Sequence, residues 1–283
     1  MQIAKLLNSS GKPSVGIVQG SEIEIVDLGN YADLSSVLAT SSPAAPIGSL
    51  RRTGEKVSVA SAQLLPPIDA QEVWAAGVTY KRSQTARMEE SETAASCYDR
   101  VYNSPRPEIF FKATPHRVRG TGQALRIRKD ATWNVPEPEL ALVLSPDLRI
   151  VGYTIGNDMS SRDIEGDNPL YLPQAKMYDE CCGLGPWITL AEAMPSRENT
   201  EIKLSIMRGG KEVFAQGTRA SEMARTFEDL VQWLGRDNSF PAGAFLLTGT
   251  GIVPNSDFTL HPADVVKITI SGIGTLVNTI VQG

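Results

Sequence analysis

Three acidic residues in the middle of the chain have the types and the spacing of a metal site. Glu137 and Glu139 are separated by one residue in the run Asn134-Val135-Pro136-Glu137-Pro138-Glu139. The prolines favour an extended backbone, in which alternate side chains point to the same face. Two carboxylates on one face repel each other unless a cation or protons neutralise them. Asp158 follows the strand-like run Gly152-Tyr153-Thr154-Ile155-Gly156 and is expected to project from a strand end.

The ligand chemistry of these residues favours a hard divalent cation. Three carboxylates without a neighbouring thiolate or imidazole suit Mg²⁺, with Mn²⁺ and Ca²⁺ as alternatives. A solvated strand edge would explain the same Glu-x-Glu spacing, so the spacing alone leaves both interpretations open. Lys176, in Pro173-Gln174-Ala175-Lys176, is the next residue along the chain whose side chain could take part in catalysis.

Imidazole and thiol chemistry is scarce in this chain. The two histidines, His116 and His261, stand in turn-like surroundings and are interpreted as surface or structural residues. The three cysteines, Cys97, Cys181 and Cys182, form no Cys-x-x-Cys pair and are interpreted as reduced thiols. A serine or cysteine nucleophile usually needs a histidine base, so carboxylate chemistry is favoured.

Composition excludes several classes of protein. The 283 residues carry a formal net charge of −5, which argues against a nucleic-acid partner. No apolar run reaches the roughly 18 residues of a membrane span. The start of the chain lacks the apolar segment of a signal peptide, so we expect a cytoplasmic location.

The elements that must position these residues are mostly strands. We predict a small N-terminal β-rich domain over 1–66, with a Ser/Ala/Pro linker at 40–46, an extended linker at 64–68, and a larger domain over 70–283. The larger domain is predicted to be β-dominated with few helices, a mixed α+β fold, and its strands are expected at 72–76, 108–112, 139–144, 150–156, 187–190, 202–207, 245–248 and 265–270.

One helix and one exposed segment are marked by their patterns. Thr226 is a suitable N-cap, the apolar residues Phe227, Leu230, Val231 and Leu234 share one helix face, and Gly235 ends the helix. Residues 82–96 are polar, without an apolar stripe, and predict an exposed helix or a mobile flap.

The chain resembles the fumarylacetoacetate hydrolase superfamily in motifs spread over about 77–280. The resemblance implies a β-roll domain, a small N-terminal domain and a homodimer, with tetramers left open. It also implies a divalent metal held by Glu137, Glu139 and Asp158, Lys176 beside it, and Thr250 on a substrate carboxylate. The motifs are Pro107-Glu108-Ile109-Phe110-Phe111-Lys112, Pro136 to Leu140, Gly152 to Asp163, Lys176, Gly185-Pro186-Trp187, Leu247 to Gly251 and Gly272 to Asn278.

The flap departs from the hydrolases of this superfamily. Those enzymes carry a histidine and a glutamate after a Gly-x-Asn-Tyr motif, and the pair activates a water for C–C cleavage. Here Gly77-Val78-Thr79-Tyr80 is followed by Ser83 at the histidine position and Ala86 at the glutamate position. Serine is no base near neutral pH without help. The dyad that activates water is therefore missing.

The same features resemble the sugar-acid dehydratase branch, typified by 2-keto-3-deoxy-D-arabinonate dehydratase. The resemblance rests on the direct turn at 144–151, the flap run Tyr80-Lys81-Arg82-Ser83 and Glu108. That branch is metal-dependent and removes water from a 2-keto-3-deoxy acid, giving 2,5-dioxopentanoate in the typifying enzyme. We therefore predict an Mg²⁺-dependent dehydratase, a lyase, whose partner is a small-molecule 2-keto acid.

The chemistry of a 2-keto-3-deoxy acid fits this prediction. Its keto oxygen and one carboxylate oxygen chelate a cation, which acts as a Lewis acid, acidifies C3 and stabilises the enolate. Loss of the C4 hydroxyl follows if an acid protonates it. We expect Lys176 to move the C3 proton or steady the enolate, and Glu108 to be the acid/base at C4. Substrate binding is assigned to Ser83, Arg82, Arg87 and Thr250.

Several alternatives stay open at this point. Glu108 is also explained as an ordinary strand carboxylate, and Arg82 and Arg87 as residues of a solvated flap face. A C–C hydrolase or decarboxylase of an acylpyruvate-type keto acid would use the same metal site. A non-catalytic keto-acid-binding protein is the second alternative.

Overall fold

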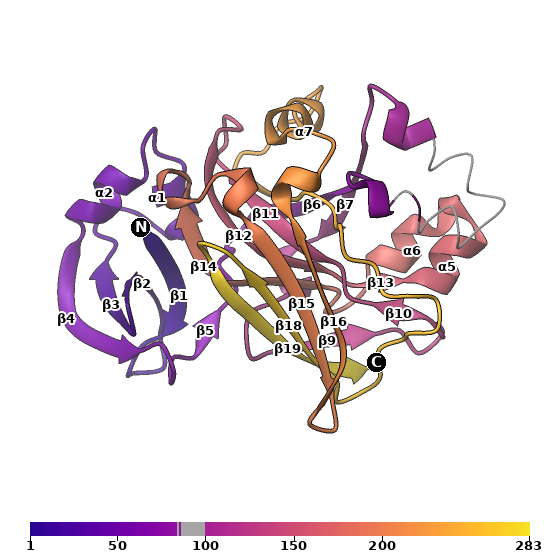
Figure 1. Cartoon of the computed structure of the whole chain (residues 1–283). Helices are drawn as coiled ribbons and strands as arrows, with labels where there is room; N and C mark the ends of the chain where they lie inside the picture. Colours follow the sequence, from indigo (N-terminus) through magenta and orange to yellow (C-terminus); the bar gives the residue numbers. More distant parts are fainter. Residues whose placement is uncertain (84, 86–99) are drawn as a thin grey trace.

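The chain forms two β-sheets that pack face to face, with helices at their margins (Figure 1). The computed structural model describes residues 1–83, 85 and 100–283. The large sheet has the order β4 (Arg51–Ser58), β3 (Glu22–Asp27), β2 (Pro13–Gln19), β1 (Gln2–Leu7), β14 (Cys182–Leu190), β12 (Ile150–Asp158), β11 (Pro138–Leu144), β17 (Ala244–Leu247), β6 (Glu72–Gly77) and β7 (Glu108–Ala113), with β5 (Leu64–Leu65) on β1 and β8 (Val118–Arg119) on β14.

The second sheet and the helices complete the fold. The second sheet has the order β16 (Lys211–Arg219), β15 (Glu201–Arg208), β18 (Val265–Ile270), β19 (Gly274–Gln282) and β9 (Ala124–Ile127), and β10 (Asn134–Val135) pairs separately with β13 (Ser160–Ser161). The α-helices that lie entirely within the described residues are α1 (Leu34–Leu38), α2 (Ala44–Ser49), α5 (Arg162–Asp167), α6 (Leu172–Lys176) and α7 (Phe227–Leu234). Short 3₁₀ turns are η1 (Pro115–Arg117), η2 (Pro169–Tyr171), η3 (Ala191–Ala193), η4 (Arg197–Asn199) and η5 (Ala220–Glu222).

The prediction of a β-dominated mixed fold is confirmed, and each of the eight predicted strands is present. The helix predicted from Thr226 is α7, and the Thr226 hydroxyl caps it by accepting the Asp229 N–H at 3.1 Å. β16 was not predicted because it is an exposed edge strand without the apolar alternation of a half-buried one.

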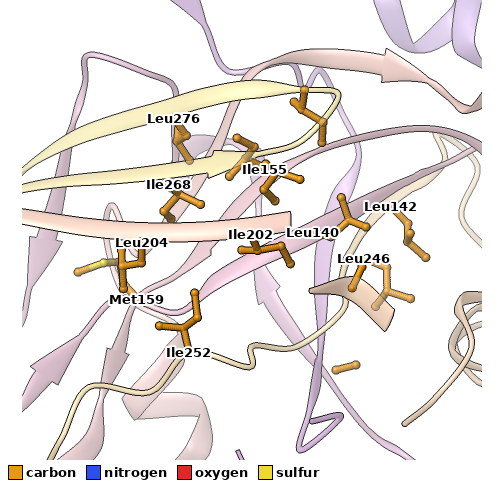
Figure 2. Close-up of a cluster of buried hydrophobic side chains, with 14 of the residues drawn as sticks. Leu140, Leu142, Ile155, Met159, Ile202, Leu204, Leu246, Ile252, Ile268 and Leu276 are labelled. Carbon is orange, nitrogen blue, oxygen red and sulfur yellow. The ribbon is translucent and has the colours of Figure 1, made fainter. Parts of the chain in front are cut away.

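Strand β11 shows why the carboxylates end up inside the protein. Leu140 and Leu142 lie in the core between the two sheets, which also contains Ile202 of β15 and Ile268 of β18 (Figure 2). Ala141 lies in a second core on the opposite face of the large sheet, which α1 and α2 also line. Both faces of β11 are therefore buried, and any polar group at its end is buried as well.

The N-terminal strands extend the large sheet, because β1 pairs with β14 through Gln2↔Thr189 and Ile3↔Ile188. The linker expected at 40–46 was wrong in its second half, since α2 begins at Ala44. The extended segment at 64–68 contains β5, which pairs with β1. Across the described residues, no helix is both long enough and apolar enough to cross a membrane.

Candidate active site

Neighbouring strands bring Glu137, Glu139 and Asp158 together. In the antiparallel pair β11–β12, Glu139 lies opposite Gly156, so Asp158 is its diagonal neighbour on the same face. The Asp158 N–H donates to the Glu137 carbonyl at 3.0 Å, which fixes Glu137 beside the end of β12. One oxygen of each carboxylate lies within 4.8 Å of the others. The expectation that Glu137 and Glu139 share a face is confirmed.

The three carboxylates are buried, which makes their mutual repulsion strong. Glu137 is 4%, Glu139 1% and Asp158 1% exposed. The pKa of Glu139 is raised well above its ordinary value, first by burial and then by the charges of Asp158 and Glu137. The Gly249 N–H, which donates to Glu139 Oε2 at 2.5 Å, opposes this shift. A buried all-oxygen set of this kind fits a hard divalent cation such as Mg²⁺.

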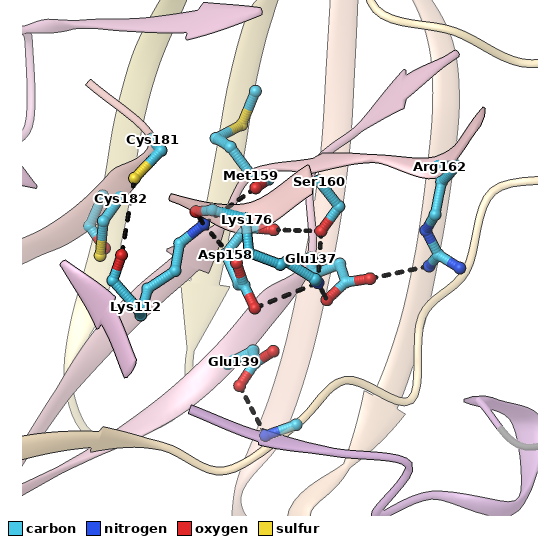
Figure 3. Close-up of polar contacts among 12 residues, drawn as sticks. Lys112, Glu137, Glu139, Asp158, Met159, Ser160, Arg162, Lys176, Cys181 and Cys182 are labelled. Carbon is cyan, nitrogen blue, oxygen red and sulfur yellow. Dashed lines mark hydrogen bonds and ion pairs between the residues drawn. The ribbon is translucent and has the colours of Figure 1, made fainter. Parts of the chain in front are cut away.

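Lys176 lies against this group of carboxylates, as predicted (Figure 3). It is the last residue of α6, and its side chain is 2% exposed. Its ammonium group donates to Glu137 Oε2 at 2.7 Å, Asp158 Oδ2 at 3.2 Å and Ser160 Oγ at 2.6 Å. The lysine is thus held between two of the three candidate metal ligands.

Two further buried cations pair with the carboxylates and were not predicted. Arg162 Nη2 lies 2.8 Å from Glu137 Oε1, on the side away from Asp158, so the arginine does not fill the space between the carboxylates (Figure 3). Lys112 Nζ lies 2.6 Å from Asp158 Oδ1 and also donates to the Met159 and Lys176 carbonyls. The sequence signal for Lys112 was a charged residue at the end of the apolar run Ile109-Phe110-Phe111.

A narrow pocket opens beside the carboxylates, between the large sheet and the residues that follow β6. It brings Ser83, Glu108 and Thr250 together with the carboxylates and Lys176. The lining residues are Ala76, Gly77, Val78, Ser83, Glu108, Phe110, Glu137, Glu139, Asp158, Glu165, Lys176, Gly249 and Thr250.

Of the residues predicted to bind substrate, Ser83 and Thr250 line the pocket, whereas Arg82 does not. Ser83 is buried, although its segment was expected to be exposed. The Thr250 hydroxyl is also buried and donates to the Ile252 carbonyl at 3.1 Å. Arg82 is partly buried next to Ser83 but is not among the lining residues. Arg87, like most of the predicted flap, lies outside the described residues.

Glu108 enters the pocket because a glycine leaves room for it. Glu108 pairs with Gly77 in the β6–β7 register, and a Cβ atom at Gly77 would overlap the Glu108 carboxylate. Glu165, from α5, lines the same pocket and is buried. Sequence reasoning missed Glu165, because only the turn from β13 into α5 directs it inward.

The two histidines and the two described cysteines, Cys181 and Cys182, are not among the residues that line this pocket. His116 and His261 are exposed, as expected. Cys181 and Cys182 are buried free thiols, and burial raises the pKa of Cys182. Cys97 lies outside the described residues.

Comparisons with known proteins identify relatives of this chain. Residues 72–281 match the model "Fumarylacetoacetate (FAA) hydrolase C-terminal", and residues 1–67 match "Rv2993c-like, N-terminal". The chain is 50% identical over 214 residues to a probable 2-keto-3-deoxyxylonate dehydratase of Haloferax volcanii, covering 76% of this chain and 73% of the relative. It is 44% identical over 221 residues to a 2-dehydro-3-deoxy-D-arabinonate dehydratase of Saccharolobus solfataricus, covering 77% and 74%.

A solved structure resembles the whole chain. It is a 2-keto-3-deoxy-D-arabinonate dehydratase complexed with magnesium and 2,5-dioxopentanoate, with a TM-score of 0.85 and 35% identity. The match covers 100% of this chain and 99% of the other. The family model alone spans most of the chain, and its residues include each candidate metal ligand. The chain therefore belongs to the fumarylacetoacetate hydrolase family.

Proposed function

We propose that this protein is an Mg²⁺-dependent dehydratase of a 2-keto-3-deoxy sugar acid, such as 2-keto-3-deoxyarabinonate, which it converts to 2,5-dioxopentanoate. The observation that carries the proposal is one pocket in which three buried carboxylates, Lys176 and Glu108 meet. The similarity to named dehydratases over three quarters of the chain supports the same reaction.

Glu137, Glu139 and Asp158 hold the cation in this proposal. The cation supplies Lewis acidity toward the keto and carboxylate oxygens of the substrate. Lys112 and Arg162 each occupy one oxygen on the outer side of a ligand, and this keeps Asp158 and Glu137 oriented toward the centre.

Lys176 and Glu108 move the protons. Lys176 is held at the centre by Glu137, Asp158 and Ser160. As the neutral amine it would take the C3 proton, and as the ammonium it would steady the negative charge that the loss of this proton creates. Glu108 protonates the C4 hydroxyl as water leaves, since both residues line the same pocket. Ser83, Arg82, Arg87 and Thr250 bind the substrate hydroxyls and carboxylate.

Ser83 separates this reaction from C–C bond hydrolysis. It lines the pocket at the position where related hydrolases carry a histidine, and a serine hydroxyl does not activate water by itself. An elimination needs no activated water, so Ser83 is compatible with a dehydratase.

The proposal is tested by parallel assays of the Mg²⁺-loaded protein. We expect water loss from 2-keto-3-deoxypentonates, and neither acetate nor CO₂ from acylpyruvates. Glu139→Gln should lower turnover by more than about a hundredfold, the upper end of the loss typical for residues that only orient a metal ligand. The exposed Glu22→Gln is the control and should be fully active. Turnover of acylpyruvate alone would indicate the hydrolase or decarboxylase, and inertness toward a 2-keto acid panel with metal bound would indicate a binding protein.

Three organisational predictions belong to the same proposal. The division into domains 1–66 and 70–283, the homodimeric or tetrameric state and the cytoplasmic location stay predictions. Light scattering on the purified protein measures the assembly, and limited proteolysis near 66–70 tests the domain boundary.

A further inference from the structure

The peptide group that joins Thr248 to Gly249 is held at both of its polar ends. Its N–H donates to Glu139 Oε2 at 2.5 Å. Its carbonyl accepts the Thr79 hydroxyl at 2.7 Å. Both hydrogen bonds are buried, and Thr79 is completely inaccessible to solvent. Rotation of this peptide would break both bonds together.

Among the described residues, it is the Gly249 N–H that donates a hydrogen bond to the Glu139 carboxylate. Glu137 and Asp158 each have a cationic side chain beside them, whereas the hydrogen-bonded contact of Glu139 is with a backbone amide. The orientation of the Glu139 carboxylate therefore depends on the orientation of that peptide.

The glycine at position 249 makes this close approach feasible. Gly249 has φ of +93°, in the region that favours glycine, and a Cβ atom there would overlap the Thr79 hydroxyl. Thr79 is the residue at which this chain departs from the Gly-x-Asn-Tyr motif of related hydrolases. The residue that differs from the motif is therefore the one whose hydroxyl binds the Thr248–Gly249 peptide.

Thr79 also belongs to the segment that begins the flap. Val78 lines the pocket with φ of +53°, a strained conformation for a β-branched residue. The Thr79 carbonyl accepts the Ala224 N–H at 2.8 Å, and Tyr80 forms a β-bridge with Met223. These contacts hold the strained backbone in place, and the Thr79 side chain links it to Glu139.

We infer that Thr79 is a positioning residue for the metal centre, which acts through the Thr248–Gly249 peptide to fix the Glu139 carboxylate. The inference rests on the proposed role of Glu139 as a metal ligand. A change in the backbone at Thr79 would therefore change the orientation of the Glu139 carboxylate, and the reverse also holds.

The test is the affinity for Mn²⁺, measured by calorimetry without substrate. Thr79→Val keeps the shape of the side chain but removes the hydroxyl, and we expect a loss of affinity of about 10- to 100-fold. Thr79→Ser retains the hydroxyl, and its Mn²⁺ affinity should stay within about threefold of that of the unaltered protein, a change well below the loss expected for Thr79→Val.

Thr154→Val is the matched control. Thr154 is equally buried, and its hydroxyl donates to the Trp187 carbonyl at 2.8 Å, so the substitution removes the same kind of bond elsewhere in the large sheet. We expect this variant to lose stability without losing Mn²⁺ affinity. If Thr79→Val does not fold, Thr79→Cys, with a weaker donor, replaces it and should bind Mn²⁺ more weakly than Thr79→Ser.

Equal Mn²⁺ affinity in the Val or Cys variant and the Ser variant would overturn the inference, as would an equal loss in Thr154→Val. Because no substrate is present, this result is independent of the reaction catalysed. Failure of the unaltered protein to dehydrate sugar acids would refute the proposed function and leave the affinity comparison intact.

Discussion

Lys112 shows how individual buried charges are balanced in this protein. Its ammonium group donates to the Met159 and Lys176 carbonyls and forms an ion pair with Asp158 Oδ1 at 2.6 Å. It therefore joins a candidate metal ligand to the end of the helix that carries Lys176. Desolvation opposes its charge, but the surrounding groups, Asp158 foremost, outweigh desolvation and raise the pKa of Lys112.

Replacing Lys112 with Met should destabilise the protein by about 3–5 kcal/mol, because Asp158 would be left buried without that partner. Urea unfolding measures the loss. Lys5→Met is the control: Lys5 pairs with Asp69 at 2.5 Å, but both side chains are partly exposed, and we expect a loss of about 1 kcal/mol or less. Equal losses in the two variants would contradict the assigned burial of the Lys112 pair.

Glu139 predicts how stability depends on pH in the metal-free protein. Its pKa is raised in the folded state, so the native protein holds this proton more tightly than the unfolded chain does. The resulting stabilisation is complete below the ordinary glutamate pKa and is lost as pH rises through the raised value. We expect the free energy of unfolding in EDTA to fall over this range.

Glu139→Gln isolates that contribution, because glutamine does not ionise. Urea unfolding of both proteins in EDTA from pH 4 upward should show a steeper decline for the unaltered protein. Parallel curves would mean that Glu139 is not the group responsible.

At the scale of elements, the β6–β7 pair carries one of the two proposed proton-transfer groups. Gly77 and Glu108 face each other in the register, and the glycine provides the space that the Glu108 carboxylate occupies. The same pair leads into the segment that carries Thr79 and Ser83. The position of the Glu108 carboxylate therefore depends on the pairing of β6 with β7 and on the glycine at position 77.

Gly77→Ala should displace the Glu108 carboxylate and lower kcat, while changing stability by no more than about 0.5 kcal/mol, since the overlap is with the end of a flexible side chain. Glu108→Gln should lower kcat by about 10²–10⁴. The double variant should be no slower than Glu108→Gln. An additional loss in the double variant would show that Gly77→Ala acts elsewhere.

At the scale of the whole molecule, the candidate metal centre joins distant parts of the sequence. Its residues come from β7, β11, β12, α6 and the loop after β17, and these elements meet around the large sheet. Binding a cation there links segments from across the chain, and it removes the repulsion among Glu137, Glu139 and Asp158.

Mg²⁺ should therefore stabilise the entire fold. At a Mg²⁺ concentration a hundred times the Kd, the gain should be about 2.7 kcal/mol, seen as a rise in Tm by calorimetry and reversed by EDTA. Glu139→Gln should lose most of this gain. A gain of the same size in that variant would place the stabilising cation somewhere else.

Local patterns in the sequence determined much of the fold. Apolar runs predicted eight strands, and the spacing of Phe227, Leu230, Val231 and Leu234 predicted α7. These patterns can be recognised in the sequence because each element buries one or both of its faces, which requires apolar residues at regular spacing. The exposed strand β16 and the short helix α2 were missed because their stability comes from pairing and packing with neighbours.

The sequence by itself also determined the chemistry available: the Glu137–Glu139 pair on one face, Asp158 at a strand end, and the lack of a histidine near the flap. Tertiary structure alone decided which charges surround those carboxylates. Lys112, Arg162 and the Gly249 N–H reach them from separate elements, and Glu165 enters the pocket from α5. Contacts between residues far apart in the chain leave no local periodicity, because they depend on how sheets and helices pack.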